Sequence, residues 1–188
     1  MSMNWPVFRT RAITAVFFVA VMLLGLMWNE WSFFVLFSLV HAGCWIEYHQ
    51  INNRILPRYA QLHSMFKSGL LLGGWACAFF FYERAIDNVI FQQAGKIIGS
   101  IGLLMIIVGG LLSVKAGIKS FVCAFLGLLY ISLSFALLMN IRSGALWMHA
   151  DTGELIGVTK SLIGLEAKWM PLILLGAIWI NDTMAYIV

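Results

Sequence analysis

The stretch that decides the fold is residues 97–114, IIGSIGLLMIIVGGLLSV, which contains no charged residue. A membrane-spanning helix needs about 20 mostly apolar residues, with about 17 as the short limit, so this run is long enough to cross a bilayer. The rest of the chain has the same character, because 62% of its 188 residues are hydrophobic and only 11% are charged. Soluble domains carry roughly 25% charged residues. The composition therefore predicts an integral membrane protein.

Five further apolar runs repeat this pattern and predict an all-α, polytopic transmembrane bundle of about six spanning helices. The six segments are Ala12–Trp28, Trp31–Ile46, Met65–Tyr82, Ile97–Val114, Phe121–Met139 and Trp169–Val188. The first two are short and only Asn29 and Glu30 separate them, so they form either a tight hairpin or a shallow re-entrant pair. No long linker or internal repeat divides the chain, which favours a single transmembrane domain over residues 1–188.

The charged residues differ between the two sides of the predicted bundle. Lys and Arg in short loops mark the cytoplasmic side. One side carries the cationic residues Arg9, Arg11, Arg54, Arg58, Lys67, Lys115 and Lys119. The loops on the other side carry charges of both signs, namely Glu30, Glu83, Arg84, Asp87, Lys96 and those of residues 142–168. This asymmetry predicts a cytoplasmic N-terminus and a last helix that runs inward.

The net charge of +4 is spread between apolar segments and forms no basic stripe. We therefore expect the lipid bilayer, and no nucleic acid, as the surroundings of this protein. Glycine-rich phosphate loops of the Walker or dinucleotide type are absent, so a nucleotide would have to be bound in another way.

The cysteines and histidines give no metal or redox signature. The three cysteines sit singly in apolar runs without a CxxC pair, which indicates packing residues rather than a disulfide scaffold or zinc site. The histidines lack the close ligand spacing of a metal site and are interpreted as polar packing or interfacial residues. They are His41, His49, His63 and His149.

Two local patterns concern packing and the longest loop. The segments Gly69–Gly73 and Gly95–Gly99 have a small residue at each end, a spacing that lets helix backbones approach closely in lipid. Between residues 142 and 168, a turn signal at Asp151–Glu154 is followed by loosely alternating apolar residues. This pattern predicts an interfacial amphipathic helix in the loop.

Asp182 is a candidate functional residue because it lies inside the last apolar run. It follows Lys168, the outer boundary of that run, by fourteen residues, or about 21 Å at 1.5 Å per residue. Against a hydrocarbon core about 30 Å thick, this places the carboxylate in the cytoplasmic third of the membrane. Such a carboxylate usually faces a polar cavity, a partner or an ion. The alternative is that the helix ends at Ile180 and residues 181–183 cap a following segment.

Glu47 is the second candidate. It lies in the sequence Trp45-Ile46-Glu47-Tyr48, where the second apolar run ends at the cytoplasmic boundary. The carboxylate there either contributes to a site with the neighbouring basic loop or forms an interfacial structural ion pair.

Three motifs together resemble a known family. They are Arg11-Ala12-Ile13-Thr14-Ala15, Trp45-Ile46-Glu47-Tyr48 and Ile178-Trp179-Ile180-Asn181-Asp182-Thr183-Met184-Ala185-Tyr186. In this order along the chain they resemble the bacterial phosphatidate cytidylyltransferases, also called CDP-diacylglycerol synthases. The third motif is the specific one, and Met184 stands where many members have glycine.

The resemblance implies a membrane-bound transferase that joins phosphatidic acid to the CMP part of CTP, with Mg2+, in the inner membrane of a bacterium. The family's Asn-Asp-Thr-x-Ala-Tyr motif belongs to its polar intramembrane site, so Asn181, Asp182 and Tyr186 are the implied site residues. Asp182 is then either a metal ligand or the group that orients a basic side chain. A homo-oligomer is compatible with this interpretation.

Family members continue past this motif into a basic segment and a C-terminal signature, whereas this sequence ends at Val188. We therefore expect an N-terminal portion of the family architecture that is inactive alone. Two other classes of function stay open at this point: a noncatalytic helical membrane subunit in which Asp182 pairs with a partner, and a small transporter that uses Asp182 and Glu47.

Overall fold

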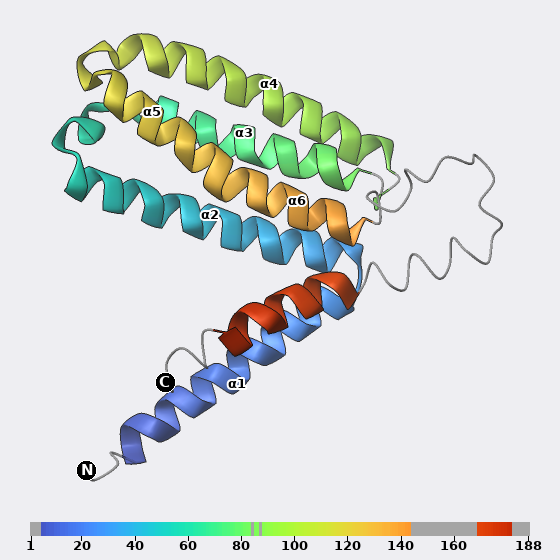
Figure 1. Cartoon of the computed structure of the whole chain (residues 1–188). Helices are drawn as coiled ribbons and strands as arrows, with labels where there is room; N and C mark the ends of the chain where they lie inside the picture. The colour runs from blue at the N-terminus through green and yellow to red at the C-terminus, as the bar shows by residue number, and fades with distance from the viewer. Residues whose placement is uncertain (1–4, 84, 87, 144–168, 182–188) are drawn as a thin grey trace.

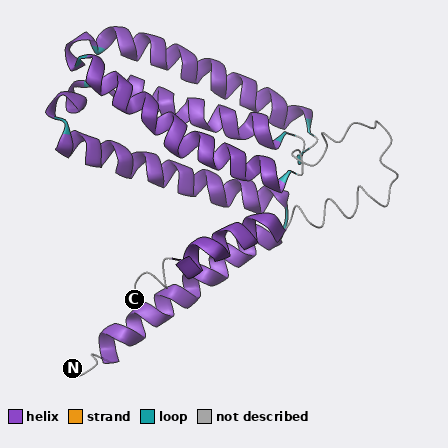
Figure 2. Ribbon diagram, in the orientation of Figure 1, coloured by secondary structure: helices purple, strands orange, loops and turns teal. Residues whose placement is uncertain are grey.

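In the computed structural model, the chain consists of helices and short turns over the residues that the structure describes, which are 5–83, 85–86, 88–143 and 169–181 (Figures 1 and 2). The helices are α1 (Trp5–Met27), α2 (Glu30–Ile55), α3 (Ser64–Tyr82), α4 (Val89–Leu112), α5 (Ile118–Gly127) and α6 (Leu133–Arg142). A π-helical turn, η3 (Leu128–Ser132), joins α5 to α6. Two 3-10 turns, η1 (Pro57–Gln61) and η2 (Val114–Ala116), follow α2 and α4. A further helix covers Trp169–Asn181.

The prediction of an all-α membrane bundle is confirmed, and each of the six predicted segments contains a helix. In the described part of the chain, three helices are long and apolar enough to cross a membrane by themselves. They are Ser64–Tyr82, Val89–Leu112 and the continuous rod Ile118–Arg142. The amphipathic helix predicted after Asp151 falls outside the described residues.

Three predicted boundaries are wrong. The first helix begins at Trp5 rather than Ala12. The second segment does not stop at Ile46, because α2 continues to Ile55. The fourth begins at Val89 rather than Ile97, so Lys96 lies within a helix and not in a loop. In all three cases the missing turns contain polar or charged residues, which interrupt the apolar run and so escape a search for such runs.

The helices form two arms that meet at one corner (Figure 1). Helices α2, α3, α4 and the α5–α6 rod pack side by side in one arm, whereas α1 and the helix Trp169–Asn181 lie together in the other, joined by a ring contact of 5.8 Å between Phe18 and Trp179. We call the end of the bundle with the α1–α2 and α3–α4 connections the hinge end. The opposite end, with the α2–α3 and α4–α5 connections, is the basic end.

The α1–α2 corner is specified by Asn29 and Ser32. The Asn29 side chain accepts a hydrogen bond from the Ser32 backbone N–H at 2.7 Å, and the Asn29 backbone N–H donates to Ser32 Oγ at 3.0 Å. This reciprocal capping box satisfies backbone donors that the first turn of a helix leaves without partners. It therefore starts α2 immediately after α1 ends, and the two helices diverge from this corner into the two arms (Figure 1).

Helices α3 and α4 touch backbone to backbone through glycines. A Cβ atom built on Gly69 would lie 2.8 Å from the Ile106 backbone nitrogen, and one on Gly102 would lie 2.9 Å from that of Gly73. Near the basic end, Gly109 faces Phe66, whose Cα would lie 2.7 Å from an added Cβ. Since lipid tails are as apolar as side chains, close van der Waals packing of this kind is what holds membrane helices together.

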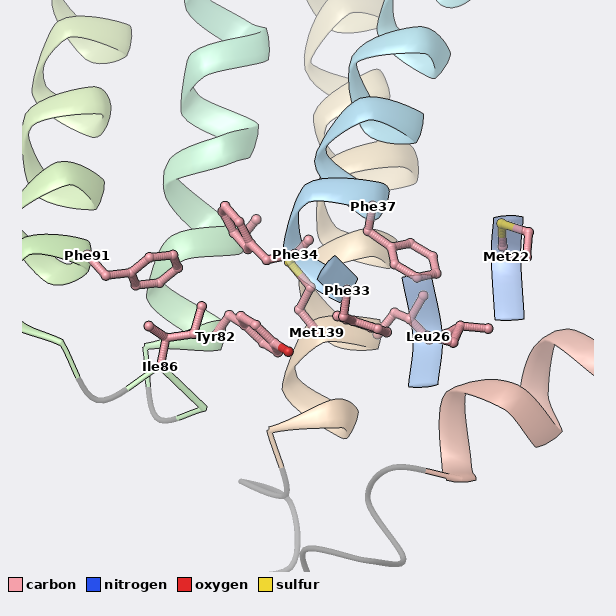
Figure 3. Packing of buried hydrophobic residues seen from close by; sticks show 11 residues of the cluster. Met22, Leu26, Phe33, Phe34, Phe37, Tyr82, Ile86, Phe91 and Met139 are labelled. Atoms are coloured by element: carbon pink, nitrogen blue, oxygen red, sulfur yellow. The ribbon is translucent and has the colours of Figure 1, made fainter. Parts of the chain in front are cut away.

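Aromatic side chains fill the bundle at both ends of this contact. The hinge-end cluster is shown in Figure 3 and combines α1, α2, α3, α4 and α6 with Ile86 of the α3–α4 loop; its fully buried members include Leu26, Phe33 and Tyr82. The basic-end cluster is built around Trp45, Tyr59 and Phe66. Each cluster joins residues from at least four segments, so the bundle is fixed at both ends.

A polar contact closes the hinge end. The Arg142 guanidinium, of which 3% is exposed, lies 2.8 Å from a carboxylate oxygen of Glu30 and 5.6 Å from the centroid of the Phe33 ring. The Tyr82 hydroxyl donates to Glu30 Oε2 at 2.6 Å. Because a buried guanidinium needs a compensating charge, this contact ties the last turn of α6 to the start of α2.

The adjacent glycines of α4 give a matched test of the α3–α4 contact. We expect Gly109→Ala to lower the free energy of unfolding by about 1–3 kcal/mol, because the added methyl group overpacks against the Phe66 backbone. Gly110→Ala is the control, since its Cβ would meet nothing closer than 3.8 Å and gains the same helix propensity. Thermal unfolding of both purified variants in detergent measures the difference, and equal stabilities would contradict the contact.

Candidate functional site

A polar face runs along the half of α2 nearer the basic end. His41, Trp45 and Asn52 are buried, and Tyr48 and His49 are half-buried. The spacing of four, three and four residues from His41 through Trp45 and Tyr48 to Asn52 places these side chains on one side of a helix. We call these five residues, with their partners on other helices, the polar seam.

The middle of the seam is a buried network of three side chains. His41 Nε2 lies 2.9 Å from Ser132 Oγ, and the Trp45 indole N–H is within 3.2 Å of His41 Nε2 and 3.0 Å of Ser132 Oγ. Gly74 of α3 leaves room for it, because a Cβ on Gly74 would lie 2.8 Å from His41 Nε2. This agrees with the interpretation of His41 as a polar packing residue.

Ser132 reaches this network because of the π-helical turn η3. In that turn the Leu133 backbone N–H bonds to the Leu128 carbonyl, five residues back. The extra residue rotates α6 relative to α5, so Ile131 and Ser132 are both buried although they are neighbours in sequence. π-helical turns occur frequently at functional sites.

Nearer the basic end, the seam links α2 to α5. The Tyr48 hydroxyl donates to the Cys123 carbonyl at 2.7 Å, the Cys123 thiol donates to Asn52 Oδ1 at 2.9 Å, and Asn52 Nδ2 donates to the Tyr48 carbonyl at 2.8 Å. These hydrogen bonds occupy Cys123, which fits the prediction that the cysteines are packing residues.

The seam ends at η1, where His49 Nδ1 lies 2.8 Å from the Tyr59 hydroxyl. Burial raises the pKa of Tyr59, and nearby Tyr48 and Cys123 raise it further, so its hydroxyl stays protonated at neutral pH. The Lys67 ammonium donates to Asn53 Oδ1 at 3.1 Å and lies 5.1 Å from the Tyr59 ring centroid. A fixed cation thus stands beside the end of the seam.

Other cations gather at the same end. The basic residues are Arg54 in the last turn of α2, Arg58 in η1, Lys115 in η2 and Lys119 in the first turn of α5. Arg58 borders the turn at Gly117, whose φ of 76° favours glycine and whose Cβ position is 3.6 Å from an Arg58 guanidinium nitrogen. The result is a positive surface next to an aromatic and amide-lined interior.

The sequence-predicted site residues are not brought together by the described structure. Glu47 is exposed on α2, about 12 Å along the helix from Ile55 at 1.5 Å per residue. Asn181 is the last described residue of the helix Trp169–Asn181, where it is exposed in the other arm. Asp182 and Tyr186 lie outside the described residues.

A resident metal centre is likewise not formed by this part of the chain. Among residues 5–83, 85–86, 88–143 and 169–181, no group of three His, Cys, Asp or Glu side chains could hold a metal ion. The closest charged cluster, Glu30 with Arg142, is an ion pair.

Sequence reasoning missed the polar seam as a unit. Its signal was present in the regular spacing of polar aromatic and amide residues from His41 to Asn52, which continues the helix past the end of the apolar run. Ser132 had no such signal, because its inward orientation depends on the π-helical turn.

The comparisons with known proteins place the chain in a family. The model of the cytidylyltransferase family matches residues 9–188, which is nearly the whole chain. The protein therefore belongs to the cytidylyltransferase family, a family of membrane-associated nucleotidyltransferases that includes phosphatidate cytidylyltransferase. No curated protein and no solved structure gives a significant match.

Ser132 allows a direct test of the central network. We expect Ser132→Ala to cost about 1–2 kcal/mol of unfolding free energy, because it leaves the buried Trp45 and His41 groups with fewer partners. Ser134→Ala is the control, since the exposed Ser134 bonds only its own helix, through the Tyr130 carbonyl. Thermal unfolding of the two variants in detergent measures the difference, and a Ser132 effect no larger than that of Ser134 would contradict the role of the network.

Proposed function

We propose that this protein is a phosphatidate cytidylyltransferase. A phosphate oxygen of phosphatidic acid attacks the α-phosphorus of CTP and forms a new P–O bond. The bond from the α-phosphorus to the bridging oxygen breaks, and pyrophosphate leaves with the electron pair. The products are CDP-diacylglycerol and pyrophosphate.

The observation that carries this proposal is the family match over residues 9–188, since it supports cytidylyl transfer at a membrane. The positive surface at the basic end adds physical support. CTP and phosphatidic acid are both anions, and a cationic rim concentrates anionic substrates and lowers their repulsion. A lipid phosphate and a soluble triphosphate can meet only at the membrane surface, which is where Arg54, Arg58 and Lys115 are expected to lie.

For the site itself we propose Asn181, Asp182 and Tyr186, with Glu47 as a further candidate. Phosphoryl-type transfer depends mainly on positioning and on neutralising charge. Asp182 would serve either as a ligand of Mg2+ or as the group that orients a cation, while Asn181 and Tyr186 would supply hydrogen bonds. The exposed side chain of Asn181 on the helix Trp169–Asn181 is accessible to a substrate, which supports this proposal.

Mg2+ enters this proposal through the family resemblance. Proteins usually hold Mg2+ with one or two carboxylates together with substrate phosphates. The described residues do not fit a resident ion, because Glu47 stands alone and Glu30 is paired with Arg142. Asp182 is therefore the carboxylate that would hold Mg2+ in this protein.

Asp182 provides the test of the function. We expect the complete product of the gene, reconstituted with phosphatidic acid, to move label from α-labelled CTP into the lipid phase. Asp182→Asn should cut this rate at least about 100-fold, because the neutral amide no longer balances a cation.

The control is Asp151→Asn, which removes a carboxylate outside the predicted site and should leave the rate within twofold. Near-normal turnover in Asp182→Asn would remove Asp182 from the site. Label transfer to a different phosphate acceptor but not to phosphatidic acid would refute the proposed substrate while leaving the family activity in place.

We further propose that the basic end faces the cytoplasm, with the N-terminus on that side, as the distribution of Lys and Arg favours. In a background with the three native cysteines replaced by alanine, we expect a membrane-impermeant maleimide to label Val89→Cys in intact cells. Gln61→Cys, in η1, should react only after the cells are permeabilised. The opposite labelling pattern would reverse the topology.

A further inference from the structure

A lateral groove lies between α3 and α4 near the hinge end, away from the positive surface of the proposed site. Its volume is about 410 Å³, and it is lined by Ala76, Phe79, Phe80, Glu83, Gln92, Gly95 and Lys96. The lining combines two aromatic rings with one cation, one anion and one amide. This composition is unusual for a surface between two apolar helices.

The cation of the groove, Lys96, is exposed and is the one charged residue of α4. Lys96 is followed by Ile97, 59% exposed, and the groove wall opposite includes Phe80, 68% exposed. The Lys96 ammonium makes no hydrogen bond or ion pair with the described part of the chain. A lysine below the membrane surface extends its side chain toward the headgroups and binds an anion there.

The carboxylate of the groove belongs to Glu83, which lies nearer the hinge end of the bundle than Lys96. Phe79 touches Gly95, because a Cβ on Gly95 would lie 2.7 Å from Phe79 Cβ, so these two residues are at the same level. Glu83 is four residues beyond Phe79 toward the hinge end, and Lys96 is one residue beyond Gly95 in the opposite sense. The backbone positions of Glu83 and Lys96 are therefore separated by about 7.5 Å along the bundle axis at 1.5 Å per residue.

The order of groups along the groove is that of a zwitterionic phospholipid. Lys96 has the deepest backbone position of the three polar residues, Gln92 lies one turn nearer the hinge end on the same side of α4, and Glu83 follows directly after α3. In a phospholipid with a terminal ammonium, the phosphate lies next to the acyl chains and the ammonium lies further out. The Lys96 ammonium would therefore face the lipid phosphate, and the Glu83 carboxylate would face the lipid ammonium.

We propose that this groove binds a phospholipid whose headgroup carries both a phosphate and a primary ammonium. Lys96 and Gln92 bind the phosphate, Glu83 binds the ammonium, Phe79 and Phe80 flank the headgroup, and an acyl chain continues past Ala76, which lies deeper, at the level of Gly99. Such a lipid differs from phosphatidic acid, which has no ammonium, so the site is separate from the proposed reaction.

A neighbouring cavity without charged side chains provides a comparison for the groove. On the other side of Phe79, a space of about 420 Å³ is lined by Trp31, Phe34, Asn88, Ile90, Phe91 and Ala94. It contains no charged side chain and offers nothing to distinguish one headgroup from another. Selectivity is therefore expected at the groove with Lys96 and Glu83.

The test is lipid binding to the full chain without CTP. Purified protein in detergent is titrated with phosphatidylethanolamine, phosphatidylglycerol and phosphatidylcholine of identical acyl chains, and bound lipid is counted by native mass spectrometry. We expect phosphatidylethanolamine to bind at least tenfold more tightly than the other two. Lys96→Gln should weaken its binding about tenfold, and Glu83→Gln should abolish the preference over phosphatidylglycerol.

Adjacent glutamines of α4 supply a matched pair of variants. Gln92→Leu should weaken phosphatidylethanolamine binding, whereas Gln93→Leu, outside the groove lining, should not. Thermal unfolding with and without added lipid gives an independent readout for each variant: a stabilising shift that the wild type shows and Lys96→Gln lacks supports the site. Equal binding of the three lipids by the wild type, or an unchanged preference in Glu83→Gln, overturns the proposal. Neither result depends on whether the protein transfers cytidylyl groups.

Discussion

The contact between the backbones of α3 and α4 is the constraint on which the rest of the bundle depends. Lipid supplies no hydrophobic force between helices, so association relies on close packing and hydrogen bonds. Gly69, Gly102 and Gly109 bring the two helices together along their length. Phe79 lies near one end of this helix contact and Phe66 near the other. Phe79 packs against the hinge-end cluster and Phe66 belongs to the basic-end cluster, and both clusters also contain residues of α2 and of the α5–α6 rod.

Helix α2 joins this pair by different means. Its half nearer the basic end is too polar to be held by apolar packing alone, and the described hydrogen bonds to Ser132, Cys123 and Tyr59 fill that role. Buried polar groups are expensive when they lack partners, so the seam fixes α2 in one rotation about its axis. That rotation leaves Glu47 on the outer surface, and it brings the basic residues of the α2–α3 connection to one end.

The sequence predicted the helical membrane architecture and the approximate centre of each helix, because apolar runs of membrane length have few other structures available. It could not predict where α2 ends, since residues 47–55 lack an apolar run, nor the burial of Ser132, which depends on the turn before it. The glycine spacing correctly indicated close packing at Gly69. The contact with Ile106 could not be predicted from this spacing, because it depends on how α3 and α4 pack against each other. Of the implied site, Asn181 is exposed on the helix Trp169–Asn181, and the assignments of Asp182 and Tyr186 rest on the family motif.

The π-helical turn changes which side chains of the α5–α6 rod are buried. Before the turn the buried positions are Ser120, Ala124 and Gly127; within and after it they are Ile131, Ser132, Ala136, Leu138, Met139 and Arg142. The buried face is therefore wider after the turn than before it, by one residue position or about 100° of rotation. Ala124 and Ile131 contribute to the basic-end cluster, whereas Leu138 and Met139 contribute to the hinge-end cluster. Loss of one residue from the turn would rotate the half of the rod beyond it by about 100° and turn part of its buried face toward lipid, while the half before the turn kept its packing.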